Sequence, residues 1–335
     1  MLSDGTLTSL EICAGGGGQA LGVERAGFQH VALVERNPRA CATLRQNRPS
    51  WNVIEKDLRE FEPERDANLT TIDLLAGGVP CTPYSIAGHQ KGVNDERDLL
   101  PVALQLAKDL RPRAVMLENV KTLARDRNFA AVRQYIEDEL RTIGYDVQFE
   151  VLDAQDFGVP QTRKRTLIVA VQKELKKFHW PMGAWELPPT VGEVLRESMK
   201  ERGWGGADEW ARLAHDIAPT IVGGSEKHGG GDLGPDRAKQ RWGQLAVNGD
   251  STTDQVPGPD FALQHNIGRG GWKGYPKLTP EQVALLQGFP ADWMFAGSRT
   301  ARYKQIGNAF PPPVAHAVAS AIADVLLGSP AGKAA

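Results

Sequence analysis

Residues 9–19 read SLEICAGGGGQ, a short apolar strand that runs directly into four glycines. A helical pattern follows from Gln19 to Ala26. Glycine lets the backbone approach a ligand closely, and ligands of open α/β sheets bind outside the carboxyl ends of the strands. The stretch therefore predicts a strand–loop–helix unit that binds a nucleoside-containing cofactor. The glycines alone do not separate NAD from S-adenosylmethionine, and a tight turn with surface acids is the simpler alternative.

Strand and helix patterns alternate through the first half of the chain. Apolar runs predict strands at residues 8–13, 30–34, 71–76, 114–117 and 166–171, and helical patterns lie at 19–26, 38–47 and 99–110. Near-continuous apolar strands are typical of a parallel sheet that is covered on both faces. The alternation indicates a doubly wound, Rossmann-like α/β domain.

Two acids in this region suit a nucleoside. Glu35 ends the second strand, about twenty residues after the glycines, where a carboxylate can hold ribose hydroxyls. Asp57 follows Ile54 and is placed to accept a hydrogen bond from an adenine amino group. Both positions favour the cofactor interpretation of the glycine loop.

The composition of the sequence changes after Phe178, and regular helix and strand patterns become hard to find. Glycine and proline become dense, and six of the eight tryptophans lie between residues 180 and 272. Helical patterns return at 280–287 and 313–327. We therefore expect a smaller, irregular domain at residues 179–278, inserted into a larger one formed by 1–178 and 279–330. The tryptophans are expected to form the core of the small domain rather than base-stacking platforms.

The charge, cysteine content and apolar segments of the chain bear on its function class and on the compartment in which it works. The formal net charge of −2 is not that of a strongly basic nucleic-acid binder, although a local basic face suffices for binding. The three cysteines have no metal-ligand spacing, so we expect no metal site, and their odd number favours a reducing environment. The chain shows neither an apolar signal segment nor a membrane-spanning run. We expect a cytoplasmic monomer.

Residues 77–85 read GGVPCTPYS and follow the strand that ends near Ala76. Cys81 therefore lies at the same sheet edge as the glycine loop. Pro80 and Pro83 restrict the backbone of this turn, which would help to aim a nucleophilic sulfur. A buried structural thiol, the usual fate of a single cysteine, is an equally good interpretation of this motif alone.

A carboxylate and two arginines complete the pattern. The apolar run 114–120 ends in Glu118-Asn119-Val120, and a carboxylate at the mouth of a buried strand is costly unless it is paired or used. In the QTRKR stretch of residues 161–165, alternation puts Gln161, Arg163 and Arg165 on one face. The arginines could ionise Cys81, orient Glu118 or hold phosphate. Lys164 is interpreted as a solvated charge.

Taken together, these residues resemble the DNA (cytosine-5) methyltransferase family. The ordered motifs are Ala14-Gly15-x-Gly17-Gly18, Pro80-Cys81-x-Pro83-x-Ser85, Glu118-Asn119-Val120, Gln161-x-Arg163-x-Arg165, Leu278-Thr279-Pro280-Glu281 to Gln287-Gly288-Phe289-Pro290, and Gln305-Ile306-Gly307-Asn308-Ala309. The resemblance implies a S-adenosylmethionine-binding methyltransferase domain with an inserted target-recognition domain. Three departures stand out: Cys13 replaces a usual aromatic, Thr82 a common glutamine and Tyr84 a common phenylalanine.

The resemblance also implies roles for individual residues. Cys81 would add covalently to a cytosine flipped out of duplex DNA, and the catalytic set would be Cys81, Glu118, Asn119, Arg163 and Arg165. The cofactor, released as S-adenosyl-L-homocysteine, would contact Cys13, Ala14, Gly15, Gly16, Gly17, Gly18, Gln19, Glu35, Arg36, Asp57, Leu58, Gly78, Pro80, Leu100, Asn308 and Ala309. Double-stranded DNA would contact Ser85, Gln161, Gly223, Gly224, Lys227, His228, Arg237 and Arg241.

Three other functions remain open at this point. Methylation of cytosine in tRNA occurs in a branch of the family, but the long inserted stretch favours DNA. A catalytically silent DNA-binding relative would not need Cys81, Glu118 and Arg165. An NAD oxidoreductase would need a hydride-transfer site, and no matching histidine and arginine set accompanies the glycine loop. The compact chain favours a bacterial modification enzyme, with a cognate restriction endonuclease as the expected partner on the same site.

Overall fold

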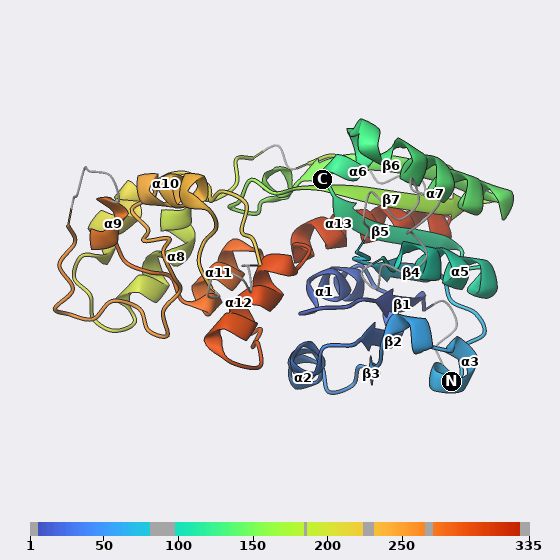
Figure 1. Cartoon of the computed structure of the whole chain (residues 1–335), viewed down its shortest axis with the longest axis horizontal. Helices are drawn as coiled ribbons and strands as arrows, with labels where there is room; N and C mark the ends of the chain where they lie inside the picture. Colours follow the sequence, from blue (N-terminus) through green and yellow to red (C-terminus); the bar gives the residue numbers. More distant parts are fainter. Residues whose placement is uncertain (1–5, 81–97, 184–185, 224–230, 265–270, 329–335) are drawn as a thin grey trace. The chain divides into compact units, whose positions relative to one another are not determined.

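The computed structural model describes residues 6–80, 98–183, 186–223, 231–264 and 271–328. Its central feature is a seven-stranded sheet with the order β3-β2-β1-β4-β5-β7-β6 (Figure 1). The strands are β1 (Thr8–Ile12), β2 (Gln29–Glu35), β3 (Val53–Glu55), β4 (Leu74–Gly77), β5 (Ala114–Val120), β6 (Tyr145–Asp153) and β7 (Lys164–Gln172). The predicted Rossmann-like α/β class is confirmed.

Strand direction decides which residues meet at the functional edge of the sheet. The five strands from β3 to β5 pair in parallel, whereas β7 runs antiparallel to β5, with Val120 opposite Arg165. Parallel strands place their carboxyl ends at one edge, and a reversed strand brings its first residue there. The ends of β4 and β5 and the start of β7 therefore meet at the edge that carries Glu118 and Arg165.

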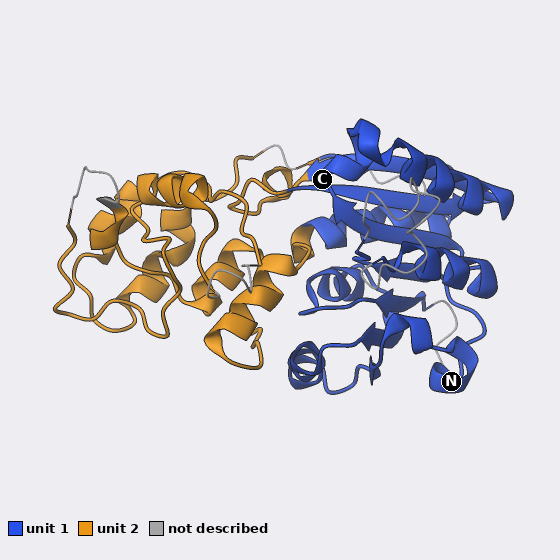
Figure 2. Cartoon of the chain, viewed as in Figure 1, with its two compact units in different colours: residues 1–152, 164–182, 314–335 blue, residues 153–163, 183–313 orange. Residues whose placement is uncertain are grey.

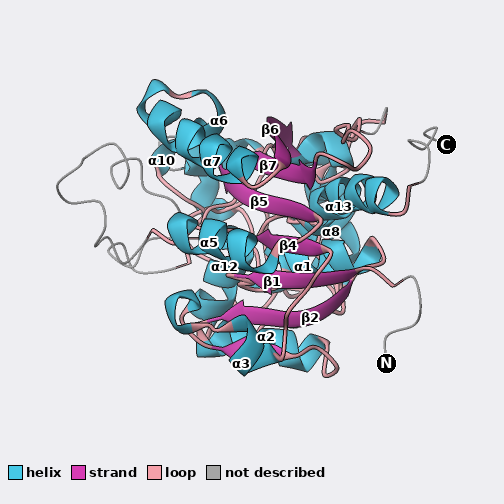
Figure 3. Cartoon of the chain, turned by 90° about the vertical axis from the view of Figure 1, so that its right-hand side faces the viewer, coloured by secondary structure: helices cyan, strands magenta, loops and turns pink. Residues whose placement is uncertain are grey.

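Helices connect these strands (Figure 3). In this part of the chain they are α1 (Gly18–Arg25), α2 (Pro38–Asn47), α3 (Pro63–Ala67), α5 (Leu100–Leu110), α6 (Thr122–Arg125), α7 (Ala130–Thr142) and α13 (Pro312–Leu326), with short 3₁₀ turns η1 (Leu58–Glu60), η3 (Arg127–Phe129) and η4 (Ala154–Phe157). The stretch Arg299–Leu326 has the length and apolarity of a membrane span, but 67% of its most apolar window is buried inside the protein. The Val/Ala-rich part, residues 314–326, contributes most of these buried side chains.

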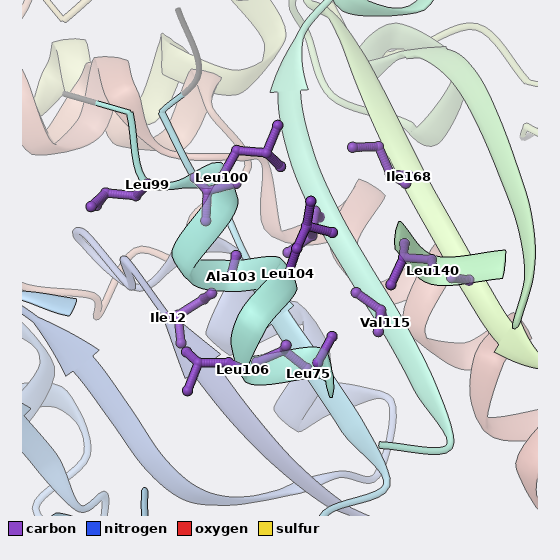
Figure 4. Close-up of a cluster of buried hydrophobic side chains, with 14 of the residues drawn as sticks. Ile12, Leu75, Leu99, Leu100, Ala103, Leu104, Leu106, Val115, Leu140 and Ile168 are labelled. Carbon is purple, nitrogen blue, oxygen red and sulfur yellow. The ribbon is translucent and has the colours of Figure 1, made fainter. Parts of the chain in front are cut away.

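One face of the sheet carries the main apolar core (Figure 4). Apolar residues of α5 recur every three or four positions, which gives the helix one buried stripe. Leu100, Leu104 and their neighbours pack against Leu75, Val115 and Ile168 of the strands. Burial of this stripe fixes α5, and the start of α5 in turn borders the functional edge.

The other face of the sheet is partly polar. The hydroxyl of Ser9 bonds to His30, whose second ring nitrogen bonds to the carbonyl of Ala20 in α1. Burial lowers the pKa of His30 and raises that of the fully buried Glu11, so both side chains favour their neutral forms. This network attaches α1, and with it the glycine loop, to the sheet.

The chain divides into two compact units (Figure 2). Unit 1 comprises residues 1–152, 164–182 and 314–335, and unit 2 comprises 153–163 and 183–313. The described part of unit 2 between residues 183 and 313 has helices and no strand: α8 (Val191–Lys200), α9 (Ala207–Leu213), α10 (Asp236–Gln244), α11 (Pro280–Leu286), α12 (Arg299–Asn308) and the 3₁₀ turn η6 (Gly271–Gly274).

The division differs from the expected boundary at residues 278 and 279. Gln282 of α11 donates to the hydroxyl of Ser198 in α8, which keeps residues 279–313 with unit 2. Trp204, Trp210 and Trp242 are buried, so these described tryptophans form core as predicted. The indole of Trp210 donates to the carbonyl of Ala246 at 2.8 Å, and this bond satisfies its buried N–H.

Candidate active site and cofactor pocket

The glycine loop is held in shape by one carboxylate. Cys13, Gly15 and Gly17 have positive φ values of 53°, 54° and 89°, so the loop turns through the left-handed region three times. Glu35 accepts hydrogen bonds from the backbone N–H of Gly15 at 2.7 Å and of Asn37 at 2.8 Å. A single side chain at the end of β2 therefore fixes both the glycine loop and the start of α2.

A cavity of about 360 Å³ opens beside this loop. Its walls come from the carboxyl ends of the parallel strands and from the start of α5: Cys13, Val34, Glu35, Arg36, Lys56, Leu58, Pro80 and Leu99. Four of these residues are aliphatic, and Glu35 supplies an acceptor. The aliphatic walls and the Glu35 carboxylate fit the adenosine part of S-adenosylmethionine, because the purine is flat and the ribose presents hydroxyl donors, and Arg36 and Lys56 add two cations to the lining.

The structure brings only some of the predicted cofactor residues to this cavity. Cys13, Glu35, Arg36, Leu58 and Pro80 line it. Leu100 does not, because it is fully buried in the core cluster, and the preceding Leu99 lines the cavity instead. The sequence also missed Lys56, which directly follows β3.

Several other predicted cofactor residues do not line the cavity but make contacts within the protein. Gly16, Gly17 and Gly18 are buried, and the buried Gln19 donates to the carbonyl of Met116. Ala14 is also buried, and its N–H bonds to Val34. Asp57 caps η1 and pairs with Arg36 and Arg59, and these bonds lower the pKa of its carboxyl.

Two of the three cysteines have unreactive environments. Burial, with a contribution from nearby carboxylates, raises the pKa of the Cys13 thiol to about 12. Burial likewise raises the pKa of Cys41 to about 12, and its sulfur donates to the carbonyl of Glu35. Since the thiolate is the nucleophilic form, both act as neutral groups near pH 7. Cys81 and Ser85 lie outside the described residues.

The acid at the end of β5 is held by an ion pair. Oε1 of Glu118 lies 2.9 Å from Nε of Arg165, and both side chains are mostly buried. Gly78 faces this carboxylate: a Cβ at that position would come within 3.2 Å of Oε2 of Glu118. Gly78 therefore leaves space for the acid rather than lining the cavity beside the glycine loop.

Asn119 connects this acid to the end of β4. Its side-chain amide donates to the carbonyl of Val79 at 2.9 Å and accepts from the N–H of Val120. Val79 immediately precedes Pro80 and Cys81 in the sequence. Asn119 thus fixes the backbone at Val79, two residues before the predicted nucleophile in the sequence.

Comparison with known proteins decides the family. The model of the family described as C-5 cytosine-specific DNA methylase matches residues 7–324. The chain belongs to this family. It is 49% identical over 321 residues to Type II methyltransferase M.NaeI of Lentzea aerocolonigenes, covering 95% of this chain and 75% of that protein. It is 48% identical over 322 residues to Type II methyltransferase M.NgoMIV of Neisseria gonorrhoeae, covering 95% and 98%.

Solved structures agree with the fold of this DNA methylase. A putative DNA modification methyltransferase encoded within an E. coli prophage has a TM-score of 0.65 and 21% identity, covering 96% of this chain and 99% of its own. The Entamoeba histolytica methyltransferase EhMeth has a TM-score of 0.66 and 16% identity, with coverage of 96% and 99%. At these identities the likeness establishes the fold alone.

In the DNA methylase, Arg163 lies in the interior of unit 2 and is 1% exposed. Its guanidinium donates to the carbonyls of Ile221 at 2.6 Å, Gly307 at 3.0 Å and Ala309 at 2.9 Å. The expectation that Arg163 acts in the catalytic set or holds phosphate is therefore wrong, because these bonds and its burial remove its guanidinium from solvent. It joins three separate stretches of unit 2 instead.

Gln161 occupies a similar interior position, so its predicted contact with DNA does not fit either. The side chain is fully buried, donates to the carbonyl of Leu286 and accepts from the N–H of Ile221. The alternation of residues 161–165 predicts that Gln161 and Arg163 share a face. It does not predict that this face is buried.

Two small residues let the stretch around Ile221 pack against the end of α12. A Cβ at Gly223 would lie 2.0 Å from Oδ1 of Asn308, and a Cβ at Gly307 would lie 2.5 Å from the carbonyl oxygen of Val222. Asn308 is exposed and its side chain lies against Gly223, whereas Ala309 is buried within unit 2. Gly224, Lys227 and His228 lie outside the described residues.

Two of the three basic side chains on helix α10 are exposed, and the third lies beside acids. Arg237 and Arg241 are exposed. Lys239 is not available in the same way, since its ammonium lies 3.5 Å from Asp232 and 4.0 Å from Asp250. Of the three cations on this helix, Arg237 and Arg241 remain candidates for phosphate contacts.

Replacing Glu35 with alanine is expected to weaken S-adenosylmethionine binding about 10- to 100-fold, since hydrogen bonds to a charged group are worth about 1.5–3 kcal/mol. Isothermal titration calorimetry measures the change. Glu55 is the matched control, because it lies opposite Glu35 in the β2–β3 pairing and pairs with Arg45 at the surface. Equal affinities of Glu35→Ala and Glu55→Ala would refute this role.

Replacing Arg163 with methionine is expected to lower the free energy of unfolding by about 3 kcal/mol or more, because three buried carbonyls each lose a hydrogen bond, although Ala309 keeps the one from Gln287. Urea unfolding followed by circular dichroism measures the loss. Arg237→Met removes an exposed guanidinium from the same unit and is expected to change the stability by less than about 0.5 kcal/mol. Similar midpoints for the two variants would contradict the structural role of Arg163.

Proposed function

We propose that the chain, a C-5 cytosine DNA methyltransferase of the Type II kind, acts on a cytosine flipped out of duplex DNA through a covalent adduct with Cys81. S-adenosylmethionine is the methyl donor of its family. The observation that carries this proposal is the Glu118–Arg165 pair at the sheet edge where β4 ends and the chain runs on to Cys81. A base within a stacked duplex cannot reach such an edge, so it must be extruded.

The chemistry requires an added nucleophile. Carbon 5 of cytosine is a weak nucleophile, and addition of the Cys81 thiolate to carbon 6 gives carbon 5 enamine character. Glu118 protonates or hydrogen-bonds N3 of the ring as negative charge develops there. Arg165 holds the Glu118 carboxyl in place through the 2.9 Å contact.

Methyl transfer is followed by elimination of Cys81, which reverses its addition to carbon 6. Bound S-adenosylmethionine would supply an electrophilic methyl group on its sulfonium: carbon 5 takes the methyl group, and S-adenosylhomocysteine is the leaving group. The proton on carbon 5 then leaves to water or hydroxide, the electron pair restores the C5–C6 double bond, and the Cys81 thiolate is expelled. Asn119 keeps the turn that bears Cys81 in place through its bond to Val79.

Transfer of radiolabelled methyl groups tests the substrate. Duplex DNA is expected to become labelled and tRNA is not, and bisulfite sequencing of DNA from cells that express the protein then locates the modified cytosines. Labelling of tRNA in preference to DNA would replace the proposal with the tRNA function. Transfer to neither would favour a silent DNA-binding relative.

We further propose that this methyltransferase is paired with a restriction endonuclease that cuts the same sequence. The names of the two relatives described above, both Type II methyltransferases, support this pairing. Plasmid DNA from expressing cells is expected to resist the endonuclease that recognises the bisulfite-defined site. Cleavage of fully modified plasmid by that endonuclease would argue against the pairing.

A further inference from the structure

Lys56 lines the cavity beside the glycine loop, although none of the sequence motifs includes it. It directly follows the last residue of β3. Its backbone N–H donates to the carbonyl of Glu35 at 3.0 Å, which ties it to the end of β2. Because Glu35 is the acid that fits the ribose, Lys56 borders the part of the cavity that suits a nucleoside.

An acid on helix α3 holds the ammonium of Lys56. The ammonium donates to Oδ2 of Asp66 at 2.7 Å, and the two side chains are 26% and 12% exposed. Asp66 also accepts from the N–H of Glu62 at 2.9 Å and from Nε of Arg65 at 3.1 Å. The hydrogen bonds from Lys56, Glu62 and Arg65 lower the pKa of Asp66, so its carboxylate stays ionised and keeps the lysine in place.

The second cation of the cavity lining is more open to water. The guanidinium of Arg36 lies 3.4 Å from Asp57, and its side chain is 61% exposed. A hydrogen bond is electrostatically stronger where less water surrounds it. Lys56 is therefore the better placed of the two cations to bind an acceptor on a ligand.

The ammonium of Lys56 keeps donors for such a ligand. A lysine ammonium has three N–H donors, and its hydrogen bond to Asp66 uses one of them. Adenine presents ring nitrogens as acceptors, and an acceptor that leaves water without finding a donor loses affinity. The aliphatic walls Val34, Leu58, Pro80 and Leu99 offer no side-chain donor.

We infer that the Lys56 ammonium donates a hydrogen bond to a ring nitrogen of the adenine of S-adenosylmethionine, and that Asp66 is a positioning residue that acts through Lys56. The inference rests on the proposed function, because it takes S-adenosylmethionine as the methyl donor. Helix α3 then contributes to cofactor affinity through Asp66 without lining the cavity.

Replacing Lys56 with methionine removes the donor and keeps the length of the stem. The variant is expected to bind S-adenosyl-L-homocysteine about 10-fold more weakly, the low end for a hydrogen bond to a charged group because the side chain is partly exposed. Isothermal titration calorimetry without DNA measures the dissociation constants. Lys108→Met is the matched control, since Lys108 forms an ion pair with Glu139 in the same unit, is similarly exposed and does not line the cavity. Its affinity is expected to be unchanged.

Analogues of S-adenosylhomocysteine then test the hydrogen bond itself. In three of them a CH group replaces ring nitrogen N1, N3 or N7 of the adenine. Replacement of the nitrogen that Lys56 contacts is expected to weaken binding to the unmodified protein about 10-fold. That loss is expected to disappear in Lys56→Met, because the donor is gone. The ratio of two dissociation constants for one variant does not depend on its folded fraction, so partial unfolding would not obscure the result.

Replacing Asp66 with asparagine tests the positioning role. The substitution is expected to weaken binding about threefold in the unmodified background and to have no effect in the Lys56→Met background, because residues that act through one another are not additive. An equal loss in both backgrounds would show that Asp66 affects the cavity without acting through Lys56.

Three results would overturn the contact of Lys56 with adenine. They are unchanged affinity in Lys56→Met, an equal loss in Lys108→Met, and analogue losses that are absent from the unmodified protein or persist in Lys56→Met. Failure of the proposed function is recognised separately, because these titrations contain no DNA. In that case the unmodified protein binds S-adenosylhomocysteine but transfers no methyl group to duplex DNA.

Discussion

Replacing Cys81 with serine is expected to reduce methyl transfer to DNA by at least about 10⁴-fold and to abolish a covalent complex with DNA that contains 5-fluorocytosine. Fluorine at carbon 5 cannot leave as a proton does, so an adduct formed by Cys81 would persist through denaturing electrophoresis. Serine keeps the size of the side chain, but its hydroxyl remains protonated near pH 7 and adds poorly to carbon 6. The expected gel shows one shifted band for the unmodified protein and none for Cys81→Ser.

The two remaining cysteines supply the controls. Cys13→Ala and Cys41→Ala are expected to retain the adduct, because burial keeps both thiols neutral. Cys13 lines the cofactor cavity, so Cys41→Ala is the control that leaves this cavity unchanged. An adduct in Cys81→Ser would assign the nucleophile to another residue. The absence of an adduct in the unmodified protein, together with normal DNA binding, would indicate the silent relative.

Replacing Glu118 with glutamine is expected to lower the kcat about 10²- to 10⁴-fold, the usual contribution of a positioned acid or base. The amide is close in size to the carboxyl, yet it cannot provide an acidic proton to N3. It also loses the charge that pairs with Arg165 across 2.9 Å. Single-turnover methyl transfer at saturating DNA and S-adenosylmethionine measures the effect on chemistry.

Glu150 provides a matched control in the same unit. It is a partly exposed acid on β6, and its nearest ion-pair contact in the described structure is Arg125 at 4.0 Å. Glu150→Gln is expected to keep the kcat within about twofold, since surface ion pairs are worth little. If Glu118→Gln raised only the KM for DNA and left the kcat intact, Glu118 would be a binding group rather than an acid.

The sheet was predictable because its strands are nearly continuous in apolar residues. The runs around Leu10, Leu75 and Val115 are buried strands, and the stripe on α5 packs against them. Residues 145–153 escaped prediction as a strand, because the β6 pattern mixes polar with apolar residues and most of its positions are only half-buried. The short β3 has three residues and little periodicity to detect.

The site was predictable where a motif dictates backbone geometry. The glycine loop, Glu35 at the end of β2 and Glu118 at the end of β5 follow from strand ends that converge on one edge. Burial of polar groups was not predictable, since alternation gives a face and says nothing about what covers it. Gln161 and Arg163 are examples: both are interior residues, although their sequence pattern is equally compatible with exposed positions.

The neutral thiols have a practical consequence for chemical probes. A maleimide or haloacetamide applied near pH 7 reacts with thiolates, and Cys13 and Cys41 hold almost none in that form. Background modification at those two positions should be slow. Protection of the remaining cysteine by bound duplex would then report occupancy of the reaction centre in the natural sequence, without any engineered label.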